Sequence, residues 1–323
     1  MELFDLLAGF TYSQVLYACV SLRVFEQIGQ NAIDPADLAT RINLPLDKTE
    51  VLVRAAVALD LLARDGGQVI LGPHGAAVLG QPWIMRFVEH HKHLYRDLED
   101  PVALLRGQTL EGELSSYWSY ENAGADKSAY SALMAASQSA VSEQILGAYD
   151  FGKHQNILDV GGGSGAFLSA VGAAHPHLAL NLFDLPGVVA LLESRVGTAI
   201  SCHAGDFRRD PLPRNMDLIS VVRIVHDHND DAVLALLKNI RAVCAASTVL
   251  LIAEPFSGSA ATARVTDAYF GLYFAAMGQG RTRTPAEIVK LAEQSGFHRP
   301  KQWHTNMPLI SGMMTFQPRP EKV

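Results

Sequence analysis

Ile157-Leu158-Asp159-Val160-Gly161-Gly162-Gly163-Ser164-Gly165 is the stretch that decides the fold of this 323-residue chain. Apolar and β-branched residues lead directly into a glycine cluster, and residues 166–171 then predict a helix. A buried strand that turns sharply into a helix begins a βαβ unit. Glycines suit such a turn because they accept unusual backbone angles and let a ligand approach the bare backbone. We therefore expect a ligand site at the carboxyl end of this strand.

Strands and helices alternate along the rest of the chain. The expected strands lie at 178–184, 199–204, 216–225 and 248–253, and the expected helices at 188–196, 231–243 and 285–295. Two last segments, 303–307 and 311–317, are predicted to pair as a closing antiparallel hairpin. Such alternation is typical of a doubly wound, Rossmann-like α/β sheet. We assign this α/β domain to residues 151–323.

The first 100 residues predict a different, mostly helical module. Residues 3–28 are too apolar for a single amphipathic face and indicate one or two helices. Asp34-Pro35 is expected to cap a helix at 36–42. Asp47 is expected to cap a second helix that reaches residue 62. A glycine turn then joins a short hairpin at 64–71. This outline is that of a winged helix. We interpret it as a dimerisation domain whose first helix is shared between two subunits, with burial inside its own domain as the alternative.

Charge argues against DNA binding by this module. Residues 1–100 hold 8 Lys and Arg against 13 Asp and Glu, and the whole chain carries a formal charge of −7. A nucleic-acid partner needs a basic face, so none is expected. The three cysteines form no CxxC pattern, which favours a reduced, cytoplasmic compartment. No apolar run reaches the ~20 residues of a membrane span, although a lipophilic substrate would bring the protein to a membrane surface.

Residues 101–150 are interpreted as a helical linker that contributes to the substrate site. Its main feature is a predicted helix at 126–149. Before this linker, His90, His91 and His93 are expected on a solvated helix face. No metal site is predicted there, because no cysteine or carboxylate stands at ligand spacing.

Polar residues follow each expected strand of the α/β domain. They are glycines 161–165, Asp184, Asp206-Phe207, His226-Asp227-His228 and Glu254. The carboxyl ends of parallel strands meet at one edge of a sheet, so these residues are expected to form one site.

The glycine turn alone leaves the cofactor open. Gly161-x-Gly163-x-x-Ala166 also fits a nicotinamide fingerprint, and Asp184 stands 23 residues after Gly161, where an acid suits ribose hydroxyls. Asp159 is costly to bury unless it meets a cation or a polar ligand. Gly205-Asp206-Phe207 offers an acid acceptor and an apolar ring that suit an adenine. An NAD-dependent dehydrogenase and a ligand-sensing winged-helix regulator remain as alternatives.

Four motifs, in this order and spacing, resemble the plant-type S-adenosylmethionine-dependent O-methyltransferases. They are Asp159 to Gly165, Phe183-Asp184-Leu185-Pro186, Gly205-Asp206-Phe207 and His226-Asp227. That family joins an N-terminal winged-helix dimerisation domain to a Rossmann-like catalytic domain, so the resemblance covers nearly the whole chain. It implies a homodimer that uses S-adenosylmethionine and releases S-adenosylhomocysteine.

The resemblance also implies roles for single residues at the cofactor. Gly161 and Gly163 would lie at the methionine moiety, Asp184 at the ribose, and Asp206 with Phe207 at the adenine. Further contacts are implied for Asp159, Leu185 and Gly205, and for Arg223, which stands where the family usually has a lysine.

His226 is implied as the general base of the reaction, and Glu254 as one of two glutamates that orient it. An imidazole of near-neutral pKa can take the proton of an acceptor hydroxyl, which is a poor nucleophile while neutral. The second glutamate of the family is replaced here by Thr282, in Thr282-Arg283-Thr284. The alternatives for His226 are a capping role at the strand end and a metal site shared with His228, which lacks further ligands.

The acceptor site is expected to be apolar, with core packing as the alternative for any single residue. The candidates are Trp118, Met134, Phe270, Tyr273, Phe274 and Met277. Leu7 to Leu16 and Gly278 to Thr284 resemble the bacterial demethylspheroidene (hydroxyneurosporene) branch of the family, which methylates a tertiary hydroxyl of a carotenoid. This implies a role in carotenoid biosynthesis; a phenolic or polyketide acceptor is the alternative.

Overall fold

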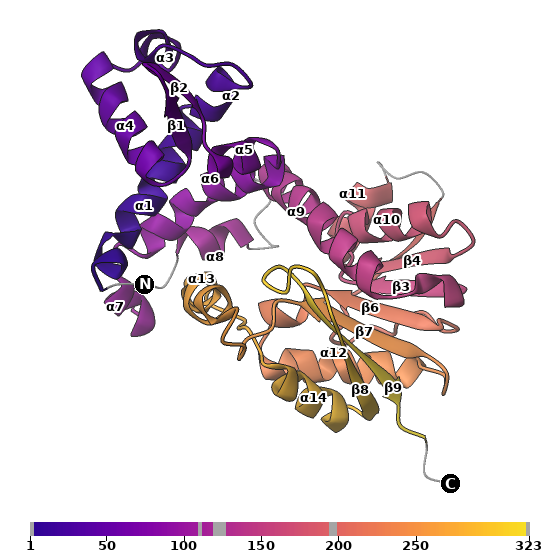
Figure 1. The fold of residues 1–323 in the computed structure, drawn as a ribbon. Coiled ribbons are helices and arrows are strands. Elements are labelled where there is room, and N and C mark those ends of the chain that lie inside the picture. The colour runs from indigo at the N-terminus through magenta and orange to yellow at the C-terminus, as the bar shows by residue number, and fades with distance from the viewer. Residues whose placement is uncertain (1–2, 109–111, 119–126, 194–198, 321–323) are drawn as a thin grey trace. The chain divides into compact units, whose positions relative to one another are not determined.

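The computed structural model describes residues 3–108, 112–118, 127–193 and 199–320 (Figure 1). The chain divides into two units, Met1–Arg96 and Asp97–Val323, each with its own internal packing.

The N-terminal unit is helical with one small hairpin. Its elements are α1 (Leu3–Ser21), α2 (Val24–Ile28), α3 (Pro35–Arg41), α4 (Leu46–Ala58), β1 (Leu62–Asp65), β2 (Gln68–Leu71), α5 (Pro73–Leu79) and α6 (Pro82–Asp97). The Asp34 side chain caps α3 by accepting from the amide of Ala36, as expected. The cap predicted at Asp47 is wrong: Pro45 is the N-cap, and α4 begins at Leu46 and ends at Ala58.

Helix α1 exposes most of its apolar side chains. Its buried residues are Cys19 and Val20 alone, whereas Leu3 and Leu7 are 83% and 75% exposed. Burial inside its own unit is therefore excluded for the first half of this helix. Within the described ranges, α1 is also the one helix long and apolar enough to cross a membrane by length and composition. The sequence led us to expect no apolar run that reaches the length of a membrane span, and α1, with 19 residues, differs from that expectation.

The histidines of α6 do not lie on a solvated face, contrary to expectation. His90 is only 5% exposed, and its ring stacks on Phe87. Burial, together with nearby His93, His91 and Lys92, lowers the pKa of His90 to about 3. In the part of the chain that the structure describes, no group of three His, Cys, Asp or Glu side chains is arranged to hold a metal ion.

A seven-stranded sheet in the order β5-β4-β3-β6-β7-β9-β8 forms the centre of the C-terminal unit. Five strands are parallel, and β9 and β8 close the sheet in antiparallel fashion. The strands are β3 (Asn156–Val160), β4 (Ala179–Asp184), β5 (Ile200–Ala204), β6 (Leu218–Val222), β7 (Val249–Glu254), β8 (Phe297–Trp303) and β9 (Gly312–Pro318). The closing hairpin exists, but its first strand ends at Trp303 instead of beginning there.

Helices cover both faces of this sheet (Figure 1). They are α9 (Lys127–Ala148), α10 (Ala166–Ala174), α11 (Pro186–Glu193), α12 (Asp230–Val243) and α14 (Pro285–Gln294); the shorter elements are α7 (Pro101–Leu105), α8 (Glu113–Trp118), α13 (Phe270–Met277), η1 (Phe151–Lys153), η2 (Val225–Asp227) and the π-helix η3 (Arg264–Tyr269). Because both faces are covered, all five residues of β6 are buried.

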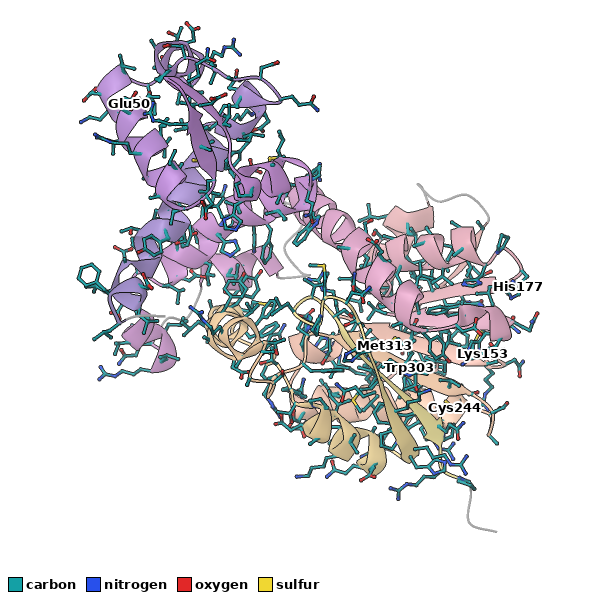
Figure 2. The ribbon with its side chains drawn as sticks, in the orientation of Figure 1. Glu50, Lys153, His177, Cys244, Trp303 and Met313 are labelled. Atoms are coloured by element: carbon teal, nitrogen blue, oxygen red, sulfur yellow. The ribbon has the colours of Figure 1, made fainter. Side chains whose placement is uncertain are left out.

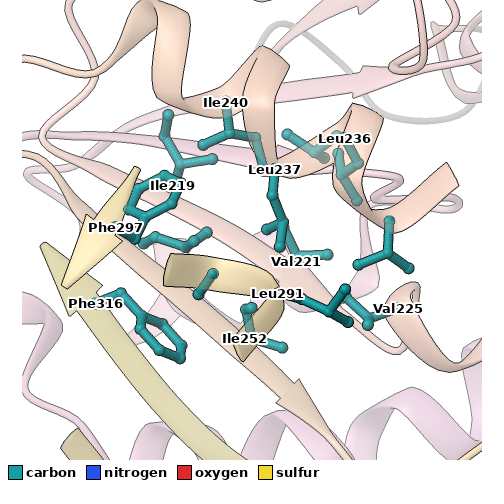
Figure 3. Packing of buried hydrophobic residues seen from close by; sticks show 14 of the residues in the cluster. Ile219, Val221, Val225, Leu236, Leu237, Ile240, Ile252, Leu291, Phe297 and Phe316 are labelled. Atoms are coloured by element: carbon teal, nitrogen blue, oxygen red, sulfur yellow. The ribbon is translucent and has the colours of Figure 1, made fainter. Parts of the chain in front are cut away.

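Two apolar clusters lie on the two faces of the sheet. Leu236 and Ile240 of α12 pack with Leu291 of α14 against Ile219 and Ile252 of the central strands (Figure 3). On the opposite face, α9 and α10 pack on β3 and β4. Near the open edge, Trp303 lies between two cations, with Lys153 Nζ 5.8 Å and Lys301 Nζ 3.6 Å from the ring centre (Figure 2). The rigid sheet fixes where its carboxyl-end loops lie.

Candidate active site

The glycine turn after β3 requires glycine for two separate reasons. Gly161, Gly163 and Gly165 have φ of 77°, 56° and 70°, in the left-handed region that other residues avoid. A Cβ on Gly161 would lie 2.5 Å from Ile224 Cδ1, so a side chain there would force Ile224 to shift. A Cβ on Gly163 would meet nothing within 4 Å. The backbone at Gly163 is therefore open to a ligand.

Asp159 is a buried carboxylate beside this turn, 2% exposed. The Ser220 hydroxyl donates to its Oδ1 at 2.7 Å, and a Cβ on Gly162 would lie 2.9 Å from its Oδ2. Burial raises the pKa of Asp159 to about 7, against the opposing effect of the Ser220 hydrogen bond, and Asp184 adds to the rise. A cation near the turn would favour its ionised form.

Asp184 fixes the turn from the end of β4. Its Oδ2 accepts from the Gly163 amide at 2.8 Å and its Oδ1 from the Leu185 amide at 2.7 Å. Burial raises the pKa of Asp184, and the two amide hydrogen bonds oppose that rise. Each carboxylate oxygen has a further acceptor position, so the carboxylate can hold the turn and still bind hydroxyls.

Asp206, after β5, is paired with a cation that the sequence did not lead us to expect. Arg208 Nε donates to its Oδ1 at 2.9 Å, and Arg208 Nη2 to its Oδ2 at 2.7 Å. Those bonds lower the pKa of Asp206 to about 2. The neighbouring Phe207 is half-buried and meets the His228 ring edge-on at 5.2 Å. Gly205 brings this loop close to β4, since a Cβ there would lie 2.5 Å from the Phe183 ring.

Arg223 directly follows strand β6 and directs the chain into the loop that carries His226. Arg223 adopts a φ of 58°, and its amide donates to the carbonyl of Ala253 at 2.8 Å. The strand expected to reach residue 225 therefore stops at Val222, and η2 follows.

His226 is 5% exposed and lies between two carboxyl groups. Its Nε2 is 3.3 Å from Asp227 Oδ1, and its Nδ1 is 4.0 Å from Glu254 Oε2. Glu254 also accepts from the His226 amide at 3.0 Å. Within the described residues, His226 Nδ1 and Glu254 Oε1 are buried without a hydrogen-bond partner. Such atoms are rare in cores and are typical of sites that bind or react.

The charges around His226 keep its imidazole neutral. Burial, then the positive charges of Arg223, His228 and Arg283, lower the pKa of His226 well below its usual value. Burial also raises the pKa of Glu254 to about 8 and that of Asp227 to about 7. A neutral imidazole can accept a proton, and two carboxyl groups stand ready to stabilise the cation that results.

Sequence reasoning missed the role of Arg283, which is fully buried beneath this loop. Its guanidinium donates to the carbonyls of Val225 and His228 and to Asp230. Thr282, at the position of the family glutamate, donates instead to the carbonyl of Thr266 in η3 at 3.0 Å. A lone arginine between two threonines carries no local signal for contacts more than 50 residues away along the chain.

Aromatic side chains of α13 lie against the base. Phe274 is 5.2 Å from the His226 ring and stacks on Phe270, while Tyr273 meets both phenylalanine rings edge-on. Tyr273, Phe274 and Met277 are buried. Helix α8 packs against α13, but the side chains of Trp118 and Met134 lie outside the described residues. A π-helix directly before α13 is a common feature of functional sites.

Comparison with known proteins identifies matching families for both units. A model described as the O-methyltransferase domain matches residues 95–298, and one described as the O-methyltransferase dimerisation domain matches residues 4–73. The demethylspheroidene O-methyltransferases of Cereibacter sphaeroides and Rhodobacter capsulatus are 41% and 40% identical to this chain. Both alignments cover 97% of it, with 86% and 80% of the relatives. The acetylserotonin O-methyltransferase of Bos taurus is 28% identical, with 90% of each chain covered.

Solved structures share the fold over the whole chain. Human N-acetylserotonin methyltransferase in complex with S-adenosylmethionine has a TM-score of 0.82 at 24% identity, covering 98% of this chain and 97% of that one. CalO1, a methyltransferase of calicheamicin biosynthesis in its S-adenosylhomocysteine-bound form, has a TM-score of 0.84 at 23% identity, with the same coverage. The predicted fold, family and cofactor are confirmed, and the dehydrogenase and regulator alternatives are set aside. The chain belongs to the S-adenosylmethionine-dependent O-methyltransferases that carry an N-terminal dimerisation domain.

Proposed function

We propose that this enzyme methylates a hydroxyl of a lipophilic carotenoid of the demethylspheroidene type, with His226 as the general base. The observation that carries the proposal is the neutral, buried imidazole of His226 between Glu254 and the Phe274 ring. The acceptor class is supported by 41% identity, over 97% of the chain, to a demethylspheroidene O-methyltransferase. The apolar side chains of α13 suit such an acceptor.

The residues at the glycine turn fit S-adenosylmethionine. The open backbone at Gly163 leaves room for a ligand, and the buried carboxyl of Asp159 gains from a nearby cation. The residues proposed to hold the cofactor are Asp159, Gly161, Gly163, Asp184, Leu185, Gly205, Asp206, Phe207 and Arg223. When bound, S-adenosylmethionine supplies a methyl group activated by a sulfonium charge.

His226 activates the acceptor by removing its proton. An aliphatic hydroxyl is a weak acid, so its proton moves to Nε2 of His226 as the oxygen becomes a nucleophile. Asp227 and Glu254 then stabilise the imidazolium, since a positive charge between them favours their ionised forms. The aromatic side chains of α13 keep out water, which would otherwise compete as a proton acceptor.

The enzyme is further proposed to act as a homodimer in the cytoplasm, at the surface of the membrane that carries its acceptor. The match to a dimerisation domain and the exposed apolar side chains of α1 support the dimer. The lipophilic character of the acceptor supports the membrane surface.

Incubation with methyl-labelled S-adenosylmethionine tests the acceptor class. Each reaction contains detergent-solubilised demethylspheroidene, N-acetylserotonin or 3-hydroxy-5-methyl-1-naphthoate as the acceptor. We expect label in demethylspheroidene with a kcat/KM at least about 100-fold above those of the two aromatic hydroxyls, because the apolar side chains of α13 beside His226 suit a lipophilic acceptor. Label confined to the aromatic acceptors would refute the carotenoid proposal and favour the phenolic or polyketide alternative.

A further inference from the structure

We propose that Arg283, anchored by Asp230, is a positioning residue that fixes the loop carrying His226 on both of its sides. The inference rests on the proposed role of His226 as the base. It assigns a function to a buried cation that does not itself touch the reacting atoms.

The guanidinium of Arg283 joins the two sides of the loop. Its Nη1 donates to the carbonyl oxygen of Val225 at 2.6 Å, and its Nη2 to that of His228 at 2.7 Å. Val225 directly precedes His226, and His228 follows it by two residues. A planar guanidinium offers several N–H donors in a fixed geometry, which a lysine cannot reproduce. The span between these two carbonyls, and with it the direction of the His226 side chain, is set by one rigid group.

Asp230 holds that guanidinium in place. Its Oδ1 accepts from Nε of Arg283 at 3.0 Å and from Nη2 at 2.7 Å. Asp230 is the first residue of α12, a 14-residue helix packed on the sheet, so the anchor belongs to a rigid element. Arg281 approaches Asp230 from the solvent side, with Nη2 3.2 Å from Oδ2. A guanidinium with 0% exposure is costly to bury unless it is paired and hydrogen-bonded in this way.

The main chain at Arg283 connects the loop that carries His226 to the segment that carries Glu254. The Ser257 amide donates to the carbonyl of Arg283 at 3.0 Å, and Phe256 and Arg283 form a parallel bridge. Residues 256 and 257 lie two and three residues after Glu254, the last residue of β7. Arg283 therefore ties together the segments that carry the base and the carboxyl group facing it.

The charge of Arg283 also acts on the imidazole. The titratable and charged groups that face His226 are Arg223 at the end of β6, Asp227 and His228 in its own loop, Glu254 of β7, and Arg283. Phe274 of α13 contributes an uncharged ring. Burial is the largest cause of the lowered pKa of His226, and the charge of Arg283 adds to that lowering. Removing its charge should raise that pKa.

Three variants of the full-length enzyme separate position from charge. Arg283→Lys keeps the positive charge but loses the planar set of N–H donors, and Arg283→Met loses both. Asp230→Asn keeps the guanidinium but weakens the carboxylate contact that holds it in place. Arg281→Met is the matched control, since it removes the other arginine that contacts Asp230. Two readouts are needed: kcat with demethylspheroidene in detergent, and the pH titration of the His226 ring signal in histidine-labelled protein. The ring signal of His226 is assigned as the one that disappears from the spectrum of His226→Gln.

We expect Arg283→Lys and Asp230→Asn to lower kcat about tenfold or more, because small displacements of a base are costly. The His226 signal of Arg283→Met should titrate at a higher pH than in the wild type, a change that a merely structural arginine would not produce. Arg281→Met should keep both the wild-type kcat and the wild-type titration.

The inference is overturned if Arg283→Lys and Asp230→Asn keep the wild-type kcat, or if His226 titrates identically in Arg283→Met. Should Arg283→Met fail to fold, Asp230→Asn decides alone, because its side chain is 48% exposed and its loss is tolerable. Failure of the proposed function is a different result: His226→Gln would then retain methyl transfer. The titration of the His226 ring needs no acceptor, so it reports on the effect of Arg283 even if the proposed function fails.

Discussion

Gly280→Ala tests how closely the chain after α13 approaches the base. Gly280 has a φ of 80°, and a Cβ there would overlap the carbonyl oxygen of His226 and lie 2.8 Å from the carbonyl carbon of Asp227. These are backbone atoms, which cannot move aside as the end of a side chain can. Gly278, two residues earlier, has a φ of 75°, and a Cβ there would meet nothing within 4 Å. The two glycines share their backbone strain and differ in the close contact.

The expected magnitudes follow from that difference. A left-handed conformation costs a non-glycine residue roughly 1–2 kcal/mol, and this is the whole expected loss of unfolding free energy for Gly278→Ala. Forcing an extra methyl into a packed region adds about 1–3 kcal/mol, so Gly280→Ala should lose about 2–5 kcal/mol. If the loop of His226 yields by about 1 Å to relieve the overlap, kcat should fall about 100-fold.

Urea unfolding gives the free energies, and initial rates of methyl transfer give kcat for both variants. Calorimetric binding of S-adenosylhomocysteine serves as the control, because the glycine turn after β3 is untouched. Equal stability and equal kcat in the two variants would refute the close contact with the His226 loop.

Two further predictions concern the carboxylates at the cofactor. Burial raises the pKa of Asp159 to about 7, so above its ordinary pKa the folded chain binds a proton that the unfolded chain has released. The contribution of Asp159 to the unfolding free energy of the cofactor-free enzyme should therefore fall as the pH rises from about 4 to about 7. Asp159→Asn should flatten that fall in thermal unfolding, and slopes parallel to the wild type would contradict the assignment. Asp206→Asn should weaken S-adenosylhomocysteine binding about fivefold to tenfold, because one charge-assisted hydrogen bond is lost. Arg208→Met, the control, should not weaken it. An unchanged Kd for Asp206→Asn in calorimetry would remove that carboxylate from the adenine site.

Features written in short stretches of sequence could be predicted. The strand and glycines at 157–165 predicted the βαβ unit. The cap at Asp34 could be predicted because the capping residue and the proline that starts the helix are adjacent. The polar residues at the strand ends could be grouped because topology alone brings parallel strand ends together. The family motifs then distinguished S-adenosylmethionine from NAD.

Features made by contacts between distant segments could not be predicted. The carbonyl that accepts the hydrogen bond from Arg283 Nη1 belongs to Val225, 58 residues earlier in the chain. The pairing of Asp206 with Arg208 is local, but an exposed arginine two residues after an acid gives no sign of a bidentate bond. His90 lies in a polar stretch, and its burial depends on packing around α6. Strand β8 ends at Trp303, and its pairing with the distant β9 includes a register shift between His298 and Lys301 that no local pattern indicates.

The rate of a single turnover in His226→Gln tests the central claim most directly. Enzyme in excess, loaded with methyl-labelled S-adenosylmethionine, is mixed with demethylspheroidene in detergent, and the labelled product is followed in time. The account predicts a rate about 100-fold or more below that of the wild type, with S-adenosylhomocysteine affinity nearly unchanged, because the imidazole removes the proton and does not hold the cofactor. A wild-type rate in His226→Gln would contradict it.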